Sequence, residues 1–236
     1  MKPYMKYRII PLLMVCLLYL TVWRVDFERY KPVFKQEKPA LKIQYILDAG
    51  HGGEDGGAIS RTGVPESHIN LEIAIKLDAL LGFLGVTTLM TRVEDISIHD
   101  NEADTLREKK ISDLKKRVSI MEQYPDSTLI SIHQNTYPKE EYRGTQIFFA
   151  PTPGSKELAY FIQQTIVSNL QPENTRQEKQ IPNTVYLMNH VKNRAILVEC
   201  GFLTNPEEEQ LLRDTEYQKK LAIVLSSGLI LQNRVE

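Results

Sequence analysis

The sequence KIQYILDAGHGG, residues 42–53, indicates how the folded part of this chain begins. Residues 42–47 form a short apolar segment of the kind found in strands, and a glycine-rich turn follows it. Apolar residues then recur at helical spacing from residue 69 to residue 84, and Gly85 is placed to end that helix. A second short strand is expected at residues 86–90. Strand, helix and strand in this order are typical of an α/β fold.

The alternation of helix and strand continues to the carboxyl end of the chain. We predict helices over residues 108–124 and 155–170, a short helix that starts at Asn205-Pro206, and a last helix from the capping residue Asp214 to Leu231. We predict further strands at residues 128–132, 145–150, 184–188 and 195–200. The expected fold is a single α/β domain with a twisted, largely parallel sheet, flanked by helices on both faces and preceded by an N-terminal hydrophobic segment.

The first 40 residues differ from the rest of the chain. Residues 9–23 are an apolar run of 15, preceded by Lys2, Lys6 and Arg8. A charged segment before an apolar one is typical of an export signal, and this run is shorter than the ~20 residues of a standard spanning helix. A cleaved signal peptide, an uncleaved membrane anchor and a buried core helix are the alternatives, and the first two place the body outside the cytoplasm. We therefore predict an export segment at residues 1–24, a polar linker at 25–40 and a domain at 41–236 that folds alone.

The composition excludes several classes of protein. The 236 residues are 42% hydrophobic and 25% charged, which excludes a disordered tail, a collagen-like repeat and a polytopic membrane protein. The formal net charge is −1, so nothing in the charge balance favours a nucleic-acid partner. Cys16 and Cys200 are the only cysteines, which excludes a disulfide framework and a cysteine-rich zinc module.

Four residues with side chains able to bind metal or move protons occupy related places. His51, His133 and Glu199 each follow an apolar strand, and Glu66 starts the first long helix. In an open α/β sheet the ligand crevice lies outside the carboxyl ends of the strands, where these residues meet. Two histidines and one carboxylate are the ligands of several catalytic zinc sites, and the remaining carboxylate could act as a general base.

Each of these residues also has an ordinary interpretation. A histidine at a strand end is more often a surface or core residue, and a glutamate at a helix start is a favourable charge for the helix dipole. Glu199 is harder to explain in this way, because a carboxylate after four apolar residues is costly to bury without a partner. The residues alone therefore favour a metal site and leave the assignment of ligand and base open.

Several motifs carry a family resemblance, and their order is the same along the chain. They are DAGHGGEDGG at residues 48–57, Glu66, Thr91-Arg92, SIHQN at residues 131–135 and ECGFLTNPE at residues 199–207. The chain resembles the zinc-dependent N-acetylmuramoyl-L-alanine amidases of the amidase 3 type, from about residue 43 to residue 232. Within that family it is most similar to the small germination-specific amidases of the spore cortex. Gln134 departs from the pattern, since the family commonly has a small residue there.

The resemblance implies a ligand set and a reaction. One zinc ion would be bound by His51, Glu66 and His133, and Glu199 would be the catalytic residue. Asp48 is a candidate for orienting His51, since a ligating histidine usually donates its second N–H to a carboxylate or carbonyl. The bond cut would join the lactyl group of N-acetylmuramic acid to L-Ala of the peptidoglycan stem peptide. In the spore cortex this would be a step toward muramic δ-lactam.

Two other classes of function stay open at this point. One is a different zinc-dependent peptidase or amidohydrolase of the cell wall, and the other is an inactive wall-binding activator with the same fold. We also expect a site that its own chain does not block, because residues 134–143 are too few, with Pro138 among them, for an occluding helix. Glu140 and Glu141 are then solvated loop charges. Control would come from expression, export or an accessory protein that supports folding or metal loading.

Overall fold

A computed structural model describes the backbone of residues 42–235 and the side chains as far as residue 232. The predicted export segment at residues 1–24 and the linker at 25–40 lie outside the described residues. Within the described part, no helix has both the length and the apolar character needed to cross a membrane.

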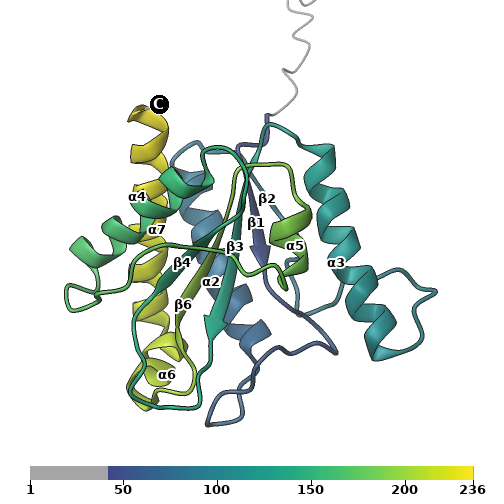
Figure 1. Ribbon diagram of the computed structural model, residues 1–236, viewed down its shortest axis with the longest axis horizontal. Helices are drawn as coiled ribbons and strands as arrows, with labels where there is room; N and C mark the ends of the chain where they lie inside the picture. The colour runs from purple at the N-terminus through teal and green to yellow at the C-terminus, as the bar shows by residue number, and fades with distance from the viewer. Residues whose placement is uncertain (1–41, 236) are drawn as a thin grey trace, which may run out of the picture. The chain divides into compact units, whose positions relative to one another are not determined.

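One mixed sheet forms the centre of the domain (Figure 1). Its six strands lie in the order β2-β1-β3-β6-β4-β5. Four neighbouring strands are parallel: β2 (Thr88–Met90), β1 (Tyr45–Ala49), β3 (Thr128–Asn135) and β6 (Ala195–Phe202). Beyond them, β4 (Gln146–Phe149) runs antiparallel to β6, and the two-residue β5 (Lys179–Gln180) runs parallel to β4. The expected largely parallel sheet is confirmed.

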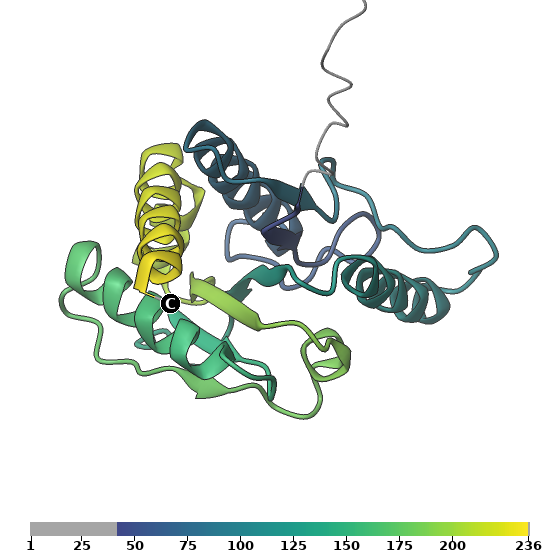
Figure 2. The same cartoon turned by 90° about the horizontal axis from the view of Figure 1, so that it is seen from above.

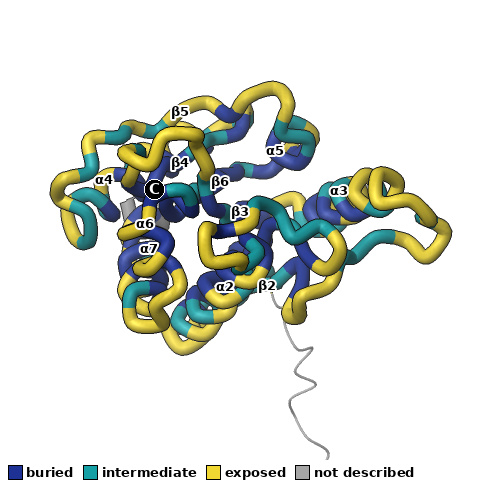
Figure 3. The backbone as a smooth tube through the Cα atoms, turned by 90° about the horizontal axis from the view of Figure 1, so that it is seen from below, coloured by how far each residue is buried: buried dark blue, intermediate teal, exposed yellow. Residues whose placement is uncertain are grey.

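Helices cover both faces of this sheet (Figure 2). One face packs against α2 (Glu66–Phe83), α4 (Ser155–Asn169), α6 (Pro206–Arg213) and α7 (Thr215–Val235). The other face packs against α3 (Leu106–Gln123) and the short α5 (Tyr186–His190). The tube in Figure 3 shows how the buried segments gather where these helices meet the strands. The prediction of helices on both faces is confirmed.

Helix ends follow the local sequence. Gly85 has a φ of 78°, and its N–H donates to the carbonyl of Gly82 while that of Val86 donates to the carbonyl of Leu81. This is the Schellman pattern, which explains why a glycine follows α2. At the other end of the chain, the Asp214 carboxylate accepts from the N–H of Tyr217, as its predicted capping role requires.

Two sequence predictions about elements are wrong. Residues 184–188 are not a strand, since Tyr186–His190 form α5. A short apolar run fits a strand or a buried helical turn equally well, and Asn189 favours the turn by donating to the carbonyls of Pro182 and Val185. Strand β5 was also not expected, because its two residues are polar and exposed.

Candidate metal centre

The four residues singled out from the sequence meet at one edge of the sheet. His51 follows β1, and Glu66 is the first residue of α2. His133 in β3 and Glu199 in β6 are direct neighbours in the parallel register, so their side chains leave the same face of the sheet. The carboxyl ends of the strands therefore bring together residues that are far apart in the sequence, as the strand pattern predicts.

Three of the four form a cluster that could hold a metal ion. One nitrogen or oxygen from each of His51, Glu66 and His133 lies within 4.8 Å of the others. His51 Nε2 is 3.4 Å from Glu66 Oε2, and His133 Nδ1 is 3.0 Å from Glu66 Oε1. Two histidine side chains, which bind metal as neutral imidazoles, and one carboxylate form a set of ligands that suits zinc. The residues present therefore fit the metal that the sequence resemblance implies.

The charge state of Glu66 suits a ligand. Burial alone would raise the pKa of this carboxyl, but its contacts with His133 and His51 outweigh burial and hold the pKa at about 2. Its oxygens also accept from the backbone N–H groups of Ala58 and Gln134, at 3.0 Å each. Asn70 Nδ2 donates to Oε1 at 3.2 Å. The side chain is thus ionised and fixed in place from three directions.

Asp55 orients His51, and this contact was not found from the sequence. Asp55 Oδ2 lies 3.0 Å from His51 Nδ1, which leaves Nε2 turned toward Glu66. Lys110 Nζ is 3.1 Å from the same carboxylate oxygen. A carboxylate behind a ligating histidine fixes its tautomer and raises its basicity. The signal was present as an acid four residues after His51 in the glycine-rich turn.

The predicted contact between Asp48 and His51 is wrong. The Asp48 carboxylate accepts from Ser131 Oγ at 2.6 Å and Thr91 Oγ1 at 2.9 Å, and it pairs with the buried guanidinium of Arg117. Asp48 lies inside β1, so its side chain points across the sheet face, whereas the chain has already turned at His51. Arg117 links the two residues, since it pairs with Asp48 and donates to the carbonyl of His51.

Two buried arginines hold the backbone on which His51 sits. Arg117 donates from Nη2 to the carbonyl of His51 at 2.8 Å and from Nη1 to that of Ala49 at 2.9 Å. Arg92 donates to the carbonyls of Ala49 at 2.9 Å and Gly50 at 3.1 Å. Both side chains are at most 3% exposed. We refer to Arg92 and Arg117 with these carbonyls as the arginine clamp.

The clamp holds a backbone conformation that is otherwise unfavourable. His51 has a φ of 62°, and it is the one residue other than glycine with a positive φ between residues 42 and 235. Gly50 is required beside it, because a Cβ there would lie 2.3 Å from the His133 ring. The glycines of this turn therefore allow the two histidine ligands to approach each other, with ring centroids 5.0 Å apart.

Glu199 has the properties of a proton acceptor rather than a further ligand. Its Oε2 is buried and has no hydrogen-bond partner among the described residues. Burial raises the pKa of Glu199 to about 7, although the neighbouring His133 partly opposes this shift. A carboxyl with a pKa near neutrality can take up and release a proton at physiological pH. The two glutamates therefore differ in their surroundings: Glu66 belongs to the metal-capable cluster, whereas Glu199 lies outside it and has an unpartnered oxygen.

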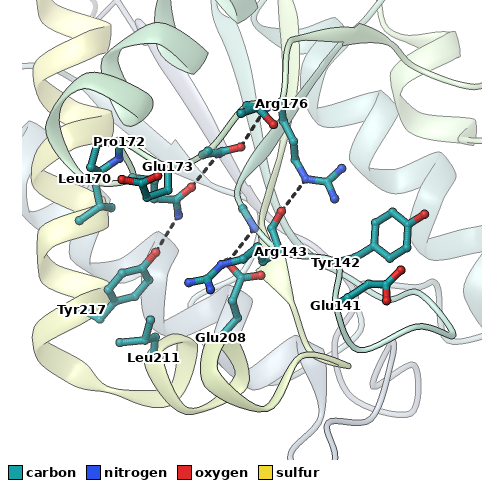
Figure 4. A pocket seen from close by; sticks show the side chains of 14 residues that line it. Glu141, Tyr142, Arg143, Leu170, Pro172, Glu173, Arg176, Glu208, Leu211 and Tyr217 are labelled. Carbon is teal, nitrogen blue, oxygen red and sulfur yellow. Dashed lines mark hydrogen bonds between the residues drawn. The ribbon is translucent and has the colours of Figure 1, made fainter.

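Two cavities border this edge of the sheet. The smaller, about 190 Å³, lies between α3 and α5 and is lined by both histidine ligands and by apolar side chains such as Leu114, Leu187 and Leu197. The larger, about 580 Å³, lies beyond β6 and includes none of the four site residues (Figure 4). Of these two cavities, the smaller is therefore the one that reaches the histidines of the metal-capable cluster.

The loop that could block the site does not do so. Residues 136–145 contain no helix, and Glu140 forms an ion pair with Arg61 instead of turning toward the histidines. Glu141 is exposed and lies 3.9 Å from Lys139 Nζ. Neither carboxylate belongs to the metal-capable cluster of the described residues. The expectation that this segment leaves the site open is confirmed.

Known proteins place the chain in a family. The family model for N-acetylmuramoyl-L-alanine amidase matches residues 46–230. The chain belongs to this family. It is 35% identical over 190 residues to the germination-specific N-acetylmuramoyl-L-alanine amidase of Bacillus subtilis (strain 168), an alignment that covers 80% of this chain and 78% of that protein.

Solved structures give the same relationship. The CwlD amidase from Clostridioides difficile, in complex with the GerS lipoprotein, has a TM-score of 0.78 and 35% identity, covering 82% of this chain and 99% of that one. An N-acetylmuramoyl-L-alanine amidase from Clostridium difficile 630 has a TM-score of 0.71 and 30% identity, covering 83% and 98%. The expected family, fold and amidase activity are thereby confirmed.

Proposed function

We propose that this amidase is zinc-dependent and hydrolyses the bond between the lactyl group of N-acetylmuramic acid and L-Ala of the peptidoglycan stem peptide. His51 through Nε2, Glu66, and His133 through Nδ1 would hold one zinc ion. Glu199 would be the catalytic acid and base. The observation that carries the proposal is the register of His133 and Glu199, which puts an unpartnered carboxyl with a pKa of about 7 next to a ligand cluster.

The residues divide the chemical work. When bound, zinc would lower the pKa of a water molecule and polarise the amide carbonyl. Glu199 Oε2 accepts the proton of the attacking water and later delivers it to the leaving nitrogen of L-Ala. Asp55 and the arginine clamp keep His51 oriented, so the ligands need not rearrange during turnover. Leu114, Leu187 and Leu197 give the adjoining cavity an apolar wall beside its charged groups.

The alternatives left open by the sequence are less well supported. An inactive activator would not need to keep a buried carboxyl at a pKa of about 7 beside a complete ligand set. A wall peptidase would use the same ligands, so it differs from an amidase only in the bond that it cuts. The family membership favours the muramyl amide over a peptide bond.

A role in spores is the cellular function that we propose. One relative is named a germination-specific amidase, and removal of stem peptides from cortex muramic acid would be a step toward muramic δ-lactam. We propose residues 1–24 as an export segment, cleaved or anchoring, residues 25–40 as a linker and residues 41–236 as the catalytic domain. The body would then act outside the cytoplasmic membrane, in the spore envelope. Because a related amidase is described in complex with a lipoprotein, an accessory protein is a suitable candidate for control.

Zinc content and product analysis together test this function. Purified protein is analysed for bound metal and incubated with peptidoglycan, and the released products are identified by mass. We expect one zinc per chain and intact stem peptides with a free amino group on L-Ala. Shortened peptides still attached to the glycan would identify a peptidase. Intact peptidoglycan in the presence of bound zinc would favour the activator.

A further inference from the structure

Gln134 lies behind the metal-capable cluster, on the face of the sheet opposite to His133. Successive side chains of a strand leave opposite faces, and Gln134 follows His133 directly in β3. Its side chain contacts Asn70 of α2, the helix that begins with Glu66. Gln134 is 4% exposed and Asn70 is completely buried. Neither lines the cavity that reaches the histidines, so neither is placed to touch a substrate there.

The Asn70 amide joins three segments of the chain. Its Nδ2 donates to Glu66 Oε1 at 3.2 Å and to the carbonyl of Gly50 at 3.1 Å. Its Oδ1 accepts from Gln134 Nε2 at 3.1 Å. Gly50 precedes one histidine of the cluster and Gln134 follows the other, so each bond reaches a segment that carries a proposed ligand. We refer to Asn70 and Gln134 as the amide pair.

Only one orientation of the Asn70 amide satisfies these contacts. A side-chain amide has two N–H donors and one carbonyl acceptor. Both partners of Asn70 Nδ2, the Glu66 carboxylate and the Gly50 carbonyl, are acceptors, so a flipped amide would place its oxygen against theirs. Gln134 supplies the donor that the Asn70 oxygen needs. The Gln134 side chain therefore fixes the orientation in which Asn70 holds the Glu66 carboxylate.

The amide pair also forms a closed ring of hydrogen bonds with this carboxylate. The backbone N–H of Gln134 donates to Glu66 Oε1 at 3.0 Å, and the same oxygen accepts from Asn70. Gln134 thus contacts Glu66 directly through its backbone and indirectly through its side chain and Asn70. Strand β3 and helix α2 pack in the same hydrophobic cluster. The ring therefore fixes Glu66 Oε1 relative to the strand that carries His133.

Packing alone does not account for a glutamine at this position. Gln134 Oε1 is buried and has no hydrogen-bond partner among the described residues. The neighbouring Cys200 thiol is only a weak hydrogen-bonding group. An unpaired buried oxygen destabilises the fold, and an apolar side chain of similar length would avoid this cost. What the amide contributes is its donor to Asn70.

We propose that Gln134 is a positioning residue, which acts through Asn70 to hold the Glu66 carboxylate in place for the metal before the metal binds. The inference rests on the proposed function, since it takes Glu66 to be a zinc ligand. A carboxylate that is already held in place loses less conformational freedom when the ion arrives, so zinc binds more tightly. Groups that orient metal ligands typically change metal affinity about 10–100-fold.

The test measures zinc affinity in the full chain, by competition with a chromophoric chelator, and the thermal midpoint of the metal-free protein. Gln134→Met keeps the approximate length of the side chain and removes its donor. We expect this variant to bind zinc about tenfold more weakly or worse. Its thermal midpoint should fall by less than about 4 °C, because the unpaired Oε1 is removed together with the hydrogen bond.

Gln163→Met is the matched control, because Gln163 is another completely buried glutamine. It lies in α4, donates to the carbonyl of Thr145 at 3.1 Å and accepts from the N–H of Ile147 at 2.8 Å. Its removal leaves both backbone groups without these bonds, so the thermal midpoint should fall by about 4 °C or more. Zinc affinity should stay the same, since β4 and the residue before it carry no proposed ligand.

A double variant tests the route through Asn70. Asn70→Ala should also weaken zinc binding, and adding Gln134→Met to it should cause no further loss, because Gln134 acts through Asn70. Additive losses would overturn the proposal. Equal zinc affinities for Gln134→Met and the unchanged protein would also overturn it. Gln134→Ala replaces Gln134→Met if that variant does not fold.

The control separates positioning from a merely structural role. If Gln163→Met lost as much zinc affinity as Gln134→Met, affinity would follow stability alone and the proposal would be wrong. Equal affinities in a protein that binds zinc and cleaves the muramyl amide would overturn only this inference. An unchanged protein that binds no zinc would contradict the proposed function and this inference together.

Discussion

The ligand loop after β1 and the wall of the larger cavity, residues 141–144 and 170–176, are held by different interactions. We refer to the second region as the pocket wall. In the ligand loop, guanidinium groups that are almost completely buried bind consecutive carbonyls of Ala49, Gly50 and His51. In the pocket wall, Arg143 and Arg176 are partly or largely exposed, and the bonds run between two surface loops. A metal site needs fixed ligands, whereas surface loops tolerate small adjustments.

The largest expected effect is on turnover, and it distinguishes Glu199 from the proposed metal ligands. Glu199→Gln should lower kcat by about 10²–10⁴-fold, because it removes the group that moves the proton. Zinc content should stay unchanged, since Glu199 is not a member of the ligand cluster. Metal analysis and rates on muropeptides check both parts.

His133→Ala is the matched comparison, because His133 is the register neighbour of Glu199 and a ligand in our assignment. It should lose both metal and activity. Equal loss of zinc from the two variants would mean that the roles of Glu199 and the ligands are exchanged.

The next prediction compares how much the arginine clamp and the pocket wall contribute to the stability of the fold. Arg117→Ala should lower the free energy of unfolding by about 3–5 kcal/mol, because it leaves the buried carboxylates of Asp48 and Asp113 without their cation. Arg176→Ala in the pocket wall should cost only about 1 kcal/mol, since that side chain is partly exposed and the buried Glu208 keeps its bonds from the N–H groups of Gly144 and Phe202. Denaturant unfolding of both variants measures the difference. Similar losses would show that the clamp contributes no more to stability than the pocket wall does.

Acid should reduce the stability that Asp48 contributes through its contact with Arg117 of the arginine clamp. Burial alone would raise the pKa of Asp48, but Arg117 and Ser131 outweigh burial and lower it from 3.8 to about 2. A carboxyl with a lowered folded-state pKa stabilises the protein above its unfolded pKa, and this stability is lost as the pH falls through the folded value. The loss should be about 2 kcal/mol between pH 4 and pH 2. Unfolding free energies of the unchanged protein and Asp48→Asn over this range test it, since the variant should show a shallower slope.

The sequence predicted the elements that alternation and periodicity determine. The β-α order and the caps at Gly85 and Asp214 agree with the structure. The strands of His133 and Glu199 run on to Asn135 and Phe202, further than predicted, but both side chains still lie near the carboxyl ends. These predictions succeed because each depends on residues close together in the chain. Strand-end residues also reach the same edge whatever the exact packing, which is why the metal cluster could be foreseen.

The contacts that the sequence did not predict depend on long-range packing. Arg117 lies in the run KKRVS of a highly charged helix, where a solvated side chain is the ordinary expectation, yet it is 2% exposed. Asp48 and Asp55 are both acids near His51, and only the path of the turn decides which one reaches Nδ1. Helix α5 replaced a predicted strand because its apolar run is too short to show a period.

A smaller effect concerns the orientation of one ligand. Asp55→Asn should weaken zinc binding about 10–100-fold, because the amide no longer stabilises the tautomer of His51 that binds metal through Nε2. Glu54→Gln is the matched control, since Glu54 is the neighbouring acid and forms only a surface ion pair with Lys109. Competition with a chromophoric chelator gives both affinities. Equal affinities would show that the Asp55 contact does not orient the ligand.

The smallest effect is expected at the loop between β3 and β4, which joins the two sides. Glu140→Gln removes the ion pair with Arg61. The Arg61 side chain is 48% exposed and the Glu140 side chain 60% exposed. Exposed pairs contribute about 0–1 kcal/mol, so stability should change little. The carbonyl of Glu140 still accepts from Asn205 at 2.8 Å, and this bond keeps the loop in place.

Since Glu140 does not reach the ligand cluster, zinc affinity and kcat should equal those of the unchanged protein. Arg61→Gln, which breaks the same pair from the other side, should behave identically. A rise in activity or in zinc uptake for Glu140→Gln alone would mean that this carboxylate competes for the metal, and that the chain does restrain its own site.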